Sequence, residues 1–146
     1  MLIVNDDWRA ALDFDCDGVH LGPDDEGFVE LGPVRDALGQ RIIGLSCGTV
    51  EEAQSANRLR ADYIGVGAVY ATGSKADAGD PIGIEGLMRV AGVAAMPVAA
   101  IGGISSRNLP TVRQTRVAMA AVISAISDAA DPNAAARELV DRWNRA

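Results

Sequence analysis

An α/β fold, in which parallel strands alternate with helices, is the fold class that the sequence predicts. Short apolar runs recur along the chain, each followed by a Gly- or Asp-rich loop and then by a segment with helical periodicity. Residues 63–69 have no polar position in their middle, which is typical of a strand covered on both faces. Aliphatic residues and 16 glycines dominate the composition, and only 4% of residues are aromatic. Buried parallel strands joined by tight turns fit this composition.

The expected elements follow one another in a regular order. Six strands are predicted, at residues 2–4, 17–21, 41–46, 63–69, 97–101 and 117–123. Helices are predicted after them, at residues 8–12, 33–38, 50–59, 84–90, 107–114 and 132–145. Each strand is therefore paired with one helix in the sequence.

Local signals mark where several of these helices begin. Pro33 suits the first helical position, where its missing N–H costs nothing. Thr49 and Glu52 have the spacing of a capping box. Ser106 is predicted to cap the next-to-last helix, and Asp131, which precedes a proline, the last one.

Two architectures accommodate this order of elements: an open doubly wound sheet and a (β/α)₈ barrel. With 146 residues, the chain is expected to form one domain over residues 1–146. No GxGxxG motif opens the first helix, so the dinucleotide-binding fingerprint is missing. About six β/α units are visible instead of eight. In either architecture the residues that follow the strands gather at one edge of the sheet.

Charge and composition exclude several classes of partner. The formal net charge is −7, and no basic cluster interrupts it, so a nucleic-acid partner is not expected. No apolar run is long enough to span a bilayer, and no leader pattern is visible at the N-terminus. The two cysteines, Cys16 and Cys47, form no CxxC pair, which fits free thiols in a reducing compartment. A soluble, cytoplasmic protein is expected, and self-association into a homo-oligomer is left open.

Acidic residues follow the first two predicted strands. Asn5 and Asp6 come after one, and Asp24 and Asp25 come after the other. Carboxylates from neighbouring loops can hold Mg²⁺ when the phosphates of a substrate supply its other oxygen ligands. Acidic loop residues are also common turn formers and helix caps, and this alternative stays open from the residues alone.

Three later loops carry features of anion sites. Thr72, Gly73, Ser74 and Lys75 follow the fourth strand and combine two hydroxyls, a glycine and an ammonium group. A solvated turn with a surface lysine is the alternative interpretation of this loop.

The other two anion loops follow the last two strands. Gly102 and Gly103 follow the fifth strand, where adjacent glycines can turn backbone N–H groups toward a ligand. Ile123 and Ser124 follow the sixth strand. Barrels commonly bind phosphate after their last two strands, although a plain strand-to-helix turn would also explain the glycines.

Three other residues with reactive side chains lie near strand ends. His20, the only histidine, is expected to be a core or rim residue more readily than an acid–base catalyst. Ser46 has no His or Asp partner at triad-like spacing, so a nucleophilic role is not expected. Cys47 lies outside any cluster of cations that would activate its thiol.

Taken in order, the loops resemble those of thiamine phosphate synthase. The resemblance rests on residues 5–7 (NDD), 17–22 (DGVHLG) with Asp25, 43–46 (IGLS), 63–67 (YIGVG), 72–75 (TGSK), 100–104 (AIGGI) and 122–126 (VISAI). It covers essentially the whole chain. It implies a (β/α)₈ barrel that joins 4-amino-5-hydroxymethyl-2-methylpyrimidine diphosphate to 4-methyl-5-(2-phosphoethyl)thiazole, releasing diphosphate.

The resemblance also implies a role for each loop. Asp6 and Asp25 would hold Mg²⁺ on the substrate diphosphate, and His20 would lie near the pyrimidine. The pyrimidine diphosphate would contact Asn5 and the two residues with catalytic roles, Ser46 and Lys75. The thiazole phosphate would be held by Thr72, Gly73, Ser74, Gly103, Ile123 and Ser124. Diphosphate leaves an electron-rich methylene in this reaction, so no protein nucleophile is needed.

Compared with the family pattern, the chain begins at the third barrel strand. The first two β/α units are absent, together with the Gln, Arg and Lys that the family places after the second strand. We therefore expect an incomplete barrel of about six parallel strands, and weak or no activity from the isolated chain. The alternatives are a thiazole tautomerase of the same barrel type, which needs no metal, and a noncatalytic remnant that binds phosphate ligands.

Overall fold

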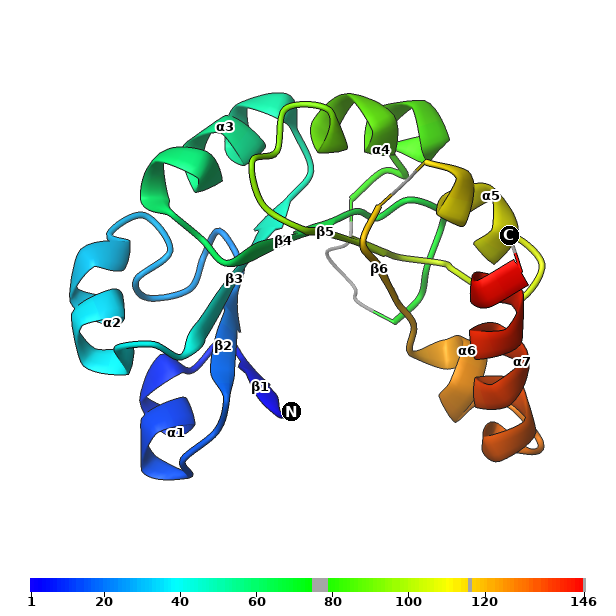
Figure 1. The fold of residues 1–146 in the computed structure, drawn as a ribbon, viewed down its shortest axis with the longest axis horizontal. Helices are drawn as coiled ribbons and strands as arrows, with labels where there is room; N and C mark the ends of the chain where they lie inside the picture. The colour runs from blue at the N-terminus through cyan, green and yellow to red at the C-terminus, as the bar shows by residue number, and fades with distance from the viewer. Residues whose placement is uncertain (75–78, 116, 146) are drawn as a thin grey trace.

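The computed structural model describes residues 1–74, 79–115 and 117–145. Within them, six parallel strands form one sheet in the order β1-β2-β3-β4-β5-β6. The strands are β1 (Ile3–Asn5), β2 (Gly18–Leu21), β3 (Ile42–Cys47), β4 (Tyr63–Val66), β5 (Val98–Ile101) and β6 (Met119–Ala121). The sheet curves into an arc with the helices along its outer side (Figure 1). This is an incomplete (β/α) barrel, so the predicted fold class is confirmed.

Seven helices accompany the strands in the described part of the chain. They are α1 (Trp8–Asp13), α2 (Leu31–Leu38), α3 (Val50–Leu59), α4 (Gly83–Ala91), α5 (Leu109–Gln114), α6 (Ser124–Ser127) and α7 (Pro132–Arg145). The last helix, α7, packs against α5 and α6 beyond β6. None of the described helices is both long and apolar enough to cross a membrane.

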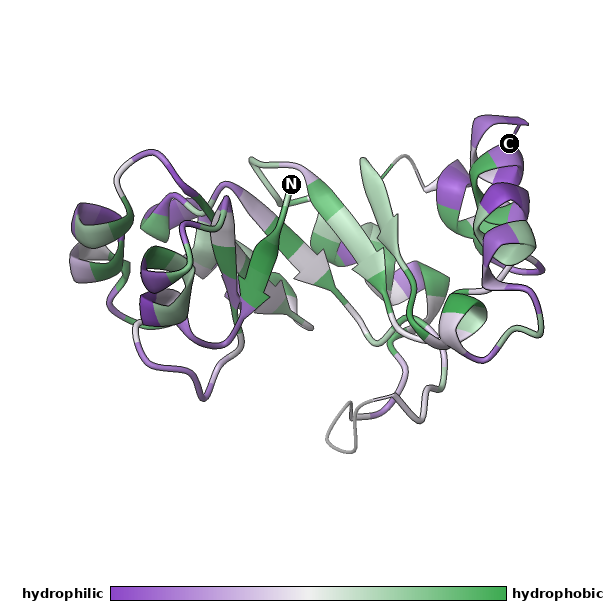
Figure 2. Cartoon of the chain, turned by 90° about the horizontal axis from the view of Figure 1, so that it is seen from below, coloured by the Kyte–Doolittle hydropathy of each residue, from purple (hydrophilic) through white to green (hydrophobic). Residues whose placement is uncertain are grey.

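The core lies between the sheet and the helices. Alternate strand residues point outward to the helices and are almost fully buried, among them Val19, Leu21, Ile43, Leu45, Ile64 and Val66. The helices show hydrophobic and hydrophilic residues together, as Figure 2 shows. Their hydrophobic residues, for example Leu38 and Leu87, are buried in the core against the strands. The other set of strand residues faces the inside of the arc, where Ile101 and Met119 are 37% and 39% exposed.

Two of the predicted helix starts are confirmed. The Thr49 hydroxyl accepts a hydrogen bond from the Glu52 amide at 3.2 Å, and the Glu52 carboxylate accepts one from the Thr49 amide at 3.0 Å. This reciprocal pair is the expected capping box. Asp131 caps α7 by accepting from the amide of Ala134 at 2.9 Å.

Other boundaries differ from the prediction. Helix α2 begins at Leu31, so Pro33 is its third residue, still in the first turn where amides have no intrahelical partner. Helix α5 begins at Leu109, because Asn108 and not Ser106 occupies the N-cap position. The short helix α6 was not predicted.

Strand boundaries shift by more than one residue at two places. Strand β4 ends at Val66, three residues earlier than predicted. The amide of Val69 still donates to Ile101 O at 2.9 Å, so the chain keeps close to β5 beyond the strand. Strand β6 is shorter than predicted at both ends, and covers Met119–Ala121. All three of its residues pair with β5, its only neighbour in the described sheet.

Asn57 connects α3 to the segment between α4 and β5. Its side-chain amide nitrogen donates to Val93 O and its oxygen accepts from Ala95 N, both at 2.8 Å. The two backbone groups are satisfied by this one side chain, which lies 36 and 38 residues earlier in the chain. Asn57 therefore fixes the segment that leads into β5.

We expect Asn57→Ala to lower the free energy of unfolding by about 1–3 kcal/mol, because both backbone groups lose their partner. Urea denaturation followed by circular dichroism measures the change. Asn133→Ala is the matched control, since Asn133 is exposed on α7. A loss in the control as large as in Asn57→Ala would contradict this account.

Candidate active site

The candidate residues follow the carboxyl ends of neighbouring parallel strands. Asp6 follows β1, Asp25 lies in the loop after β2, and Ser46 is near the end of β3. Gly103 follows β5, and Ser124 comes after β6. Because all six strands are parallel, these positions share one end of the sheet. The acidic loops and the glycine loop therefore lie at the same end of the sheet. We call this end, with the loops that follow the carboxyl ends of the strands, the mouth.

At the β1 side of the mouth the acidic residues are held by short local contacts. The Asn5 side-chain amide donates to Asp6 Oδ1 at 2.5 Å, and the Asp6 backbone amide donates to the carbonyl of His20 at 2.8 Å. Asp25 Oδ2 accepts from the amide of Gly22 at 2.5 Å. The residue that follows β1 is thus bonded to strand β2, and the loop that carries Asp25 begins at the end of that same strand.

A row of residues crosses four strands on the inner face of the sheet. The strand register pairs Asn5 with His20, His20 with Gly44, and Gly44 with Tyr63. His20 Nδ1 lies 2.9 Å from Tyr63 Oη, and His20 Nε2 lies 3.0 Å from Ser46 Oγ. His20 thus connects a residue of β4 to one of β3.

Two glycines leave room for this group. A Cβ at Gly44 would lie 2.2 Å from Cζ of Tyr63, so the phenol ring occupies the space above the missing side chain. A Cβ at Gly65 would lie 3.1 Å from Cε1 of His20. Without side chains at these positions, Tyr63 can reach across β3 to His20 on β2.

The glycine loop after β5 packs against the segment that precedes the predicted anion loop at Thr72. Gly102 and Gly103 have φ values of 98° and 62°, a backbone conformation that favours glycine. A Cβ at Gly103 would lie 2.5 Å from the carbonyl oxygen of Ala71, so this loop packs directly on the segment before Thr72. Thr72 Oγ1 accepts from the amide of Ser74 at 3.2 Å.

Asn108 fixes the glycine loop from the other side. Its side-chain nitrogen donates to Gly103 O at 3.0 Å, and its oxygen accepts from Ser105 N at 2.8 Å. This role of Asn108 was not predicted from the sequence. An Asn three to five residues after a glycine pair, before a helix, is the signal that could have identified it.

The remaining predicted residues are exposed or lie outside the described part of the chain. Ile123 and Ser124 are exposed after β6, next to β5 in the sheet, because Ala121 pairs with Ile101. Gly73 and Ser74 are also exposed. Lys75 lies outside the described residues. Tyr63, in contrast, was predicted only as part of an apolar strand, although it belongs to the inner row.

The cysteine beside Ser46 faces the other way. Cys47 is 3% exposed and belongs to the hydrophobic core. Burial, with a smaller contribution from the charge of Glu52, raises the pKa of its thiol to about 12. The expectation that Cys47 is not a nucleophile agrees with this environment.

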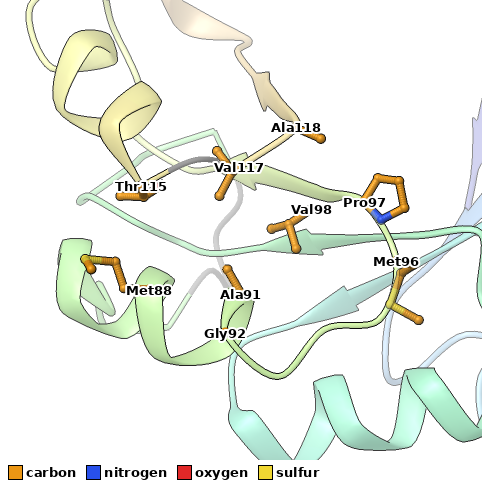
Figure 3. A pocket seen from close by; sticks show the side chains of 9 residues that line it. All are labelled: Met88, Ala91, Gly92, Met96, Pro97, Val98, Thr115, Val117 and Ala118. Atoms are coloured by element: carbon orange, nitrogen blue, oxygen red, sulfur yellow. The ribbon is translucent and has the colours of Figure 1, made fainter.

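One hollow lies far from this mouth. It has a volume of about 340 Å³ and is lined by residues of α4, of the segment entering β5 and of the segment entering β6 (Figure 3). Pro97 and Ala118 directly precede those two strands, so the hollow is at their amino-terminal ends. Among the described residues that line it, Thr115 has the only polar side chain. The candidate chemistry lies at the opposite end of the sheet.

Parallel β/α units arranged in an arc, with polar loops after the strands, define an incomplete barrel of the (β/α) class. Residues 1–126 match the family model described as thiamine monophosphate synthase. The chain belongs to this family.

Individual relatives agree with this assignment. A thiamine-phosphate synthase of Archaeoglobus fulgidus is 48% identical over 145 residues, which cover 99% of this chain and 67% of that protein. One of Desulfitobacterium hafniense is 44% identical over 143 residues, covering 97% of this chain and 68% of that protein. The chain thus spans about two thirds of these relatives. Proteins with this name are transferases.

Solved structures show the same fold. Thiamine phosphate pyrophosphorylase from Pyrococcus furiosus superposes with a TM-score of 0.88 and 38% identity, over 98% of this chain and 67% of that one. A 3-hexulose-6-phosphate synthase superposes with a TM-score of 0.70 and 21% identity, over 92% of this chain and 66% of that one. The second similarity concerns the fold alone.

We expect Cys47 to resist alkylation in the folded protein. At pH 8 a thiol with a pKa of about 12 is ionised to roughly one part in ten thousand, and the thiolate is the reactive form. Mass spectrometry of the protein treated with iodoacetamide measures the labelling, with urea-unfolded protein as the control. Equal labelling rates at Cys47 before and after unfolding would contradict the buried position.

Proposed function

We propose that this chain carries the thiamine-phosphate synthase reaction site. In this reaction the pyrimidine methylene carbon of 4-amino-5-hydroxymethyl-2-methylpyrimidine diphosphate forms a bond to the nitrogen of 4-methyl-5-(2-phosphoethyl)thiazole. The bond from that carbon to the diphosphate oxygen breaks, and diphosphate leaves. The observation that carries the proposal is the shared mouth, where acidic loops after β1 and β2 face the same end of the sheet as glycine and hydroxyl loops after β4 and β5.

The acidic side of the mouth fits Mg²⁺. Asp6 and Asp25 supply carboxylates, and Asp25 Oδ1 accepts no hydrogen bond from another described residue. No group of three or more His, Cys, Asp or Glu side chains in the described part of the chain could hold a metal. Two carboxylates are nevertheless the usual protein share for Mg²⁺ bound through substrate phosphates. Bound there, Mg²⁺ would neutralise charge on the departing diphosphate.

The other side of the mouth fits the thiazole phosphate. The positive φ values of Gly102 and Gly103 allow a backbone path that most side chains would prevent. Thr72, Gly73 and Ser74 follow Ala71, whose carbonyl oxygen lies against Gly103, and they would add hydroxyl and amide groups. Ile123 and Ser124, after the adjacent strand, complete the group assigned to the phosphate. Anchoring the phosphate tail would orient the thiazole nitrogen toward the pyrimidine.

The inner row of the sheet fits the pyrimidine. Asn5 and Ser46 present an amide and a hydroxyl on the inner face, and His20 lies between them. Lys75, assigned to the same substrate, would add a positive charge near the diphosphate. These groups bind and orient a substrate whose leaving group departs without attack by a protein nucleophile.

We expect slow diphosphate release, consistent with the weak activity expected of the isolated chain, and the release should require both substrates and Mg²⁺. A coupled assay for diphosphate on the purified chain measures the rate, and a chelator should abolish it. Asp6→Asn should raise the Mg²⁺ concentration for half-maximal rate about 10- to 100-fold, because a charge-assisted contact contributes about 1.5–3 kcal/mol. Asp36→Asn, an exposed position on α2, is the matched control.

Two outcomes would contradict the proposal. Turnover of a thiazole carboxylate phosphate that persists in the presence of a chelator would indicate a tautomerase. Absence of diphosphate release at any protein concentration, with ligand binding unaffected by Asp6→Asn, would indicate a noncatalytic phosphate-binding protein.

A further inference from the structure

Tyr63 is the residue of the inner row to which neither the loop motifs nor the proposed reaction gives a role. It is the first residue of β4, it is half-buried, and its hydroxyl contacts His20 Nδ1 at 2.9 Å. The two rings pack with their centroids 5.4 Å apart. On its other side, His20 Nε2 contacts Ser46 Oγ at 3.0 Å. Tyr63, His20 and Ser46 therefore form one continuous chain of hydrogen bonds across three strands.

Counting donors and acceptors shows which group donates in each of these hydrogen bonds. No other described residue accepts a hydrogen bond from Tyr63 Oη. If the phenol oxygen accepted from Nδ1–H, its own hydrogen would be left without a partner among the residues that the structure describes. Burial raises the pKa of Tyr63, which keeps the hydroxyl protonated and able to donate. Donation from Tyr63 to Nδ1 places the imidazole proton on Nε2.

We propose that Tyr63 is a positioning residue that selects the Nε2–H tautomer of His20 and thereby makes Ser46 a hydrogen-bond donor to the substrate. A hydroxyl has one hydrogen and can both donate and accept. When Nε2–H donates to Ser46 Oγ, the serine hydrogen is released to point into the mouth. In the opposite tautomer, Ser46 would donate to Nε2 and present only lone pairs.

Selection of a donor matters for the pyrimidine substrate. Pyrimidine ring nitrogens accept hydrogen bonds and carry no hydrogen of their own, so a serine that presents only lone pairs could not bind them. This consequence rests on the proposed function, whereas the tautomer itself does not. Gly44 and Gly65 leave room for these side chains, because a Cβ at Gly44 would collide with Tyr63 and one at Gly65 would contact His20 tightly.

The tautomer can be measured without substrate. His20 is the only histidine in the chain, so a long-range ¹H–¹⁵N correlation spectrum contains one imidazole. The spectrum should be recorded at about pH 8.5, roughly two units above the ordinary histidine pKa. We expect the Nε2–H pattern in the unaltered protein, and a shift toward Nδ1–H or a mixture in Tyr63→Phe.

Two further variants test the specificity of the effect. Tyr70→Phe removes the hydroxyl of the only other tyrosine and should leave the Nε2–H pattern unchanged. Ser46→Ala should also keep it, because Tyr63 and not Ser46 selects the tautomer. The backbone amide spectrum of each variant shows that it is folded. An Nδ1–H pattern in the unaltered protein, or one unaffected by Tyr63→Phe, overturns the proposal.

The functional consequence has its own readout. Tyr63→Phe should lower kcat about 2- to 10-fold, the effect of one hydrogen bond, and change KM less. In a Ser46→Ala background the same substitution should have little further effect, since both act through one hydroxyl. Additive losses would contradict the assigned route. Because the spectra need no turnover, a protein without synthase activity that shows the expected tautomer would refute the proposed reaction and leave the role of Tyr63 standing.

Discussion

The inner face of this sheet depends on the absence of a side chain at Gly44. His20 and Tyr63 stand on the strands to either side of it, and a Cβ at this position would overlap the phenol ring. Gly65 leaves similar room next to the imidazole. An ordinary β-strand residue at either position would better fill the sheet, but would separate the three polar side chains. Glycines at these two strand positions reduce side-chain packing, and in return they let Tyr63, His20 and Ser46 contact one another.

Close backbone contact also brings the loops together at the other side of the mouth. Gly103 lies against the carbonyl of Ala71, so the loop after β5 supports the loop after β4. Asn108 holds the glycine loop through two backbone groups. At the β1 side, the bond from Asp6 N to His20 O has the same effect on the acidic loop. Each candidate loop is thus positioned by its neighbour and not by its own sequence alone.

Much of the fold could be predicted from the sequence because its signals are local. Apolar runs indicated the strands, and the capping box at Thr49 and Glu52 marked the start of α3. The order of polar loops was sufficient to place the acidic and glycine residues at one end of a parallel sheet. The early end of β4 and the start of α5 were missed: the segment after Val66 keeps contact with β5 without being a strand, and the N-cap position is occupied by Asn108 in place of Ser106.

The role of the inner row could not be predicted in the same way. Tyr63 is one residue of an apolar run in the sequence, and only the register with Gly44 and His20 shows that its hydroxyl reaches another side chain. His20 was expected to be a satisfied core or rim residue, and its hydrogen bonds with Tyr63 and Ser46 agree with that expectation. What a single sequence lacks is the pairing between strands that lie 20 or more residues apart.

A crystal structure of the chain with Mg²⁺, thiamine phosphate and diphosphate tests the shared mouth most directly. The account predicts the metal and the diphosphate beside Asp6 and Asp25, and the phosphate of the organic ligand against residues 72–74 and 102–103. Ligand bound instead in the hollow beside Met88 and Val117, at the other end of the sheet, would contradict it.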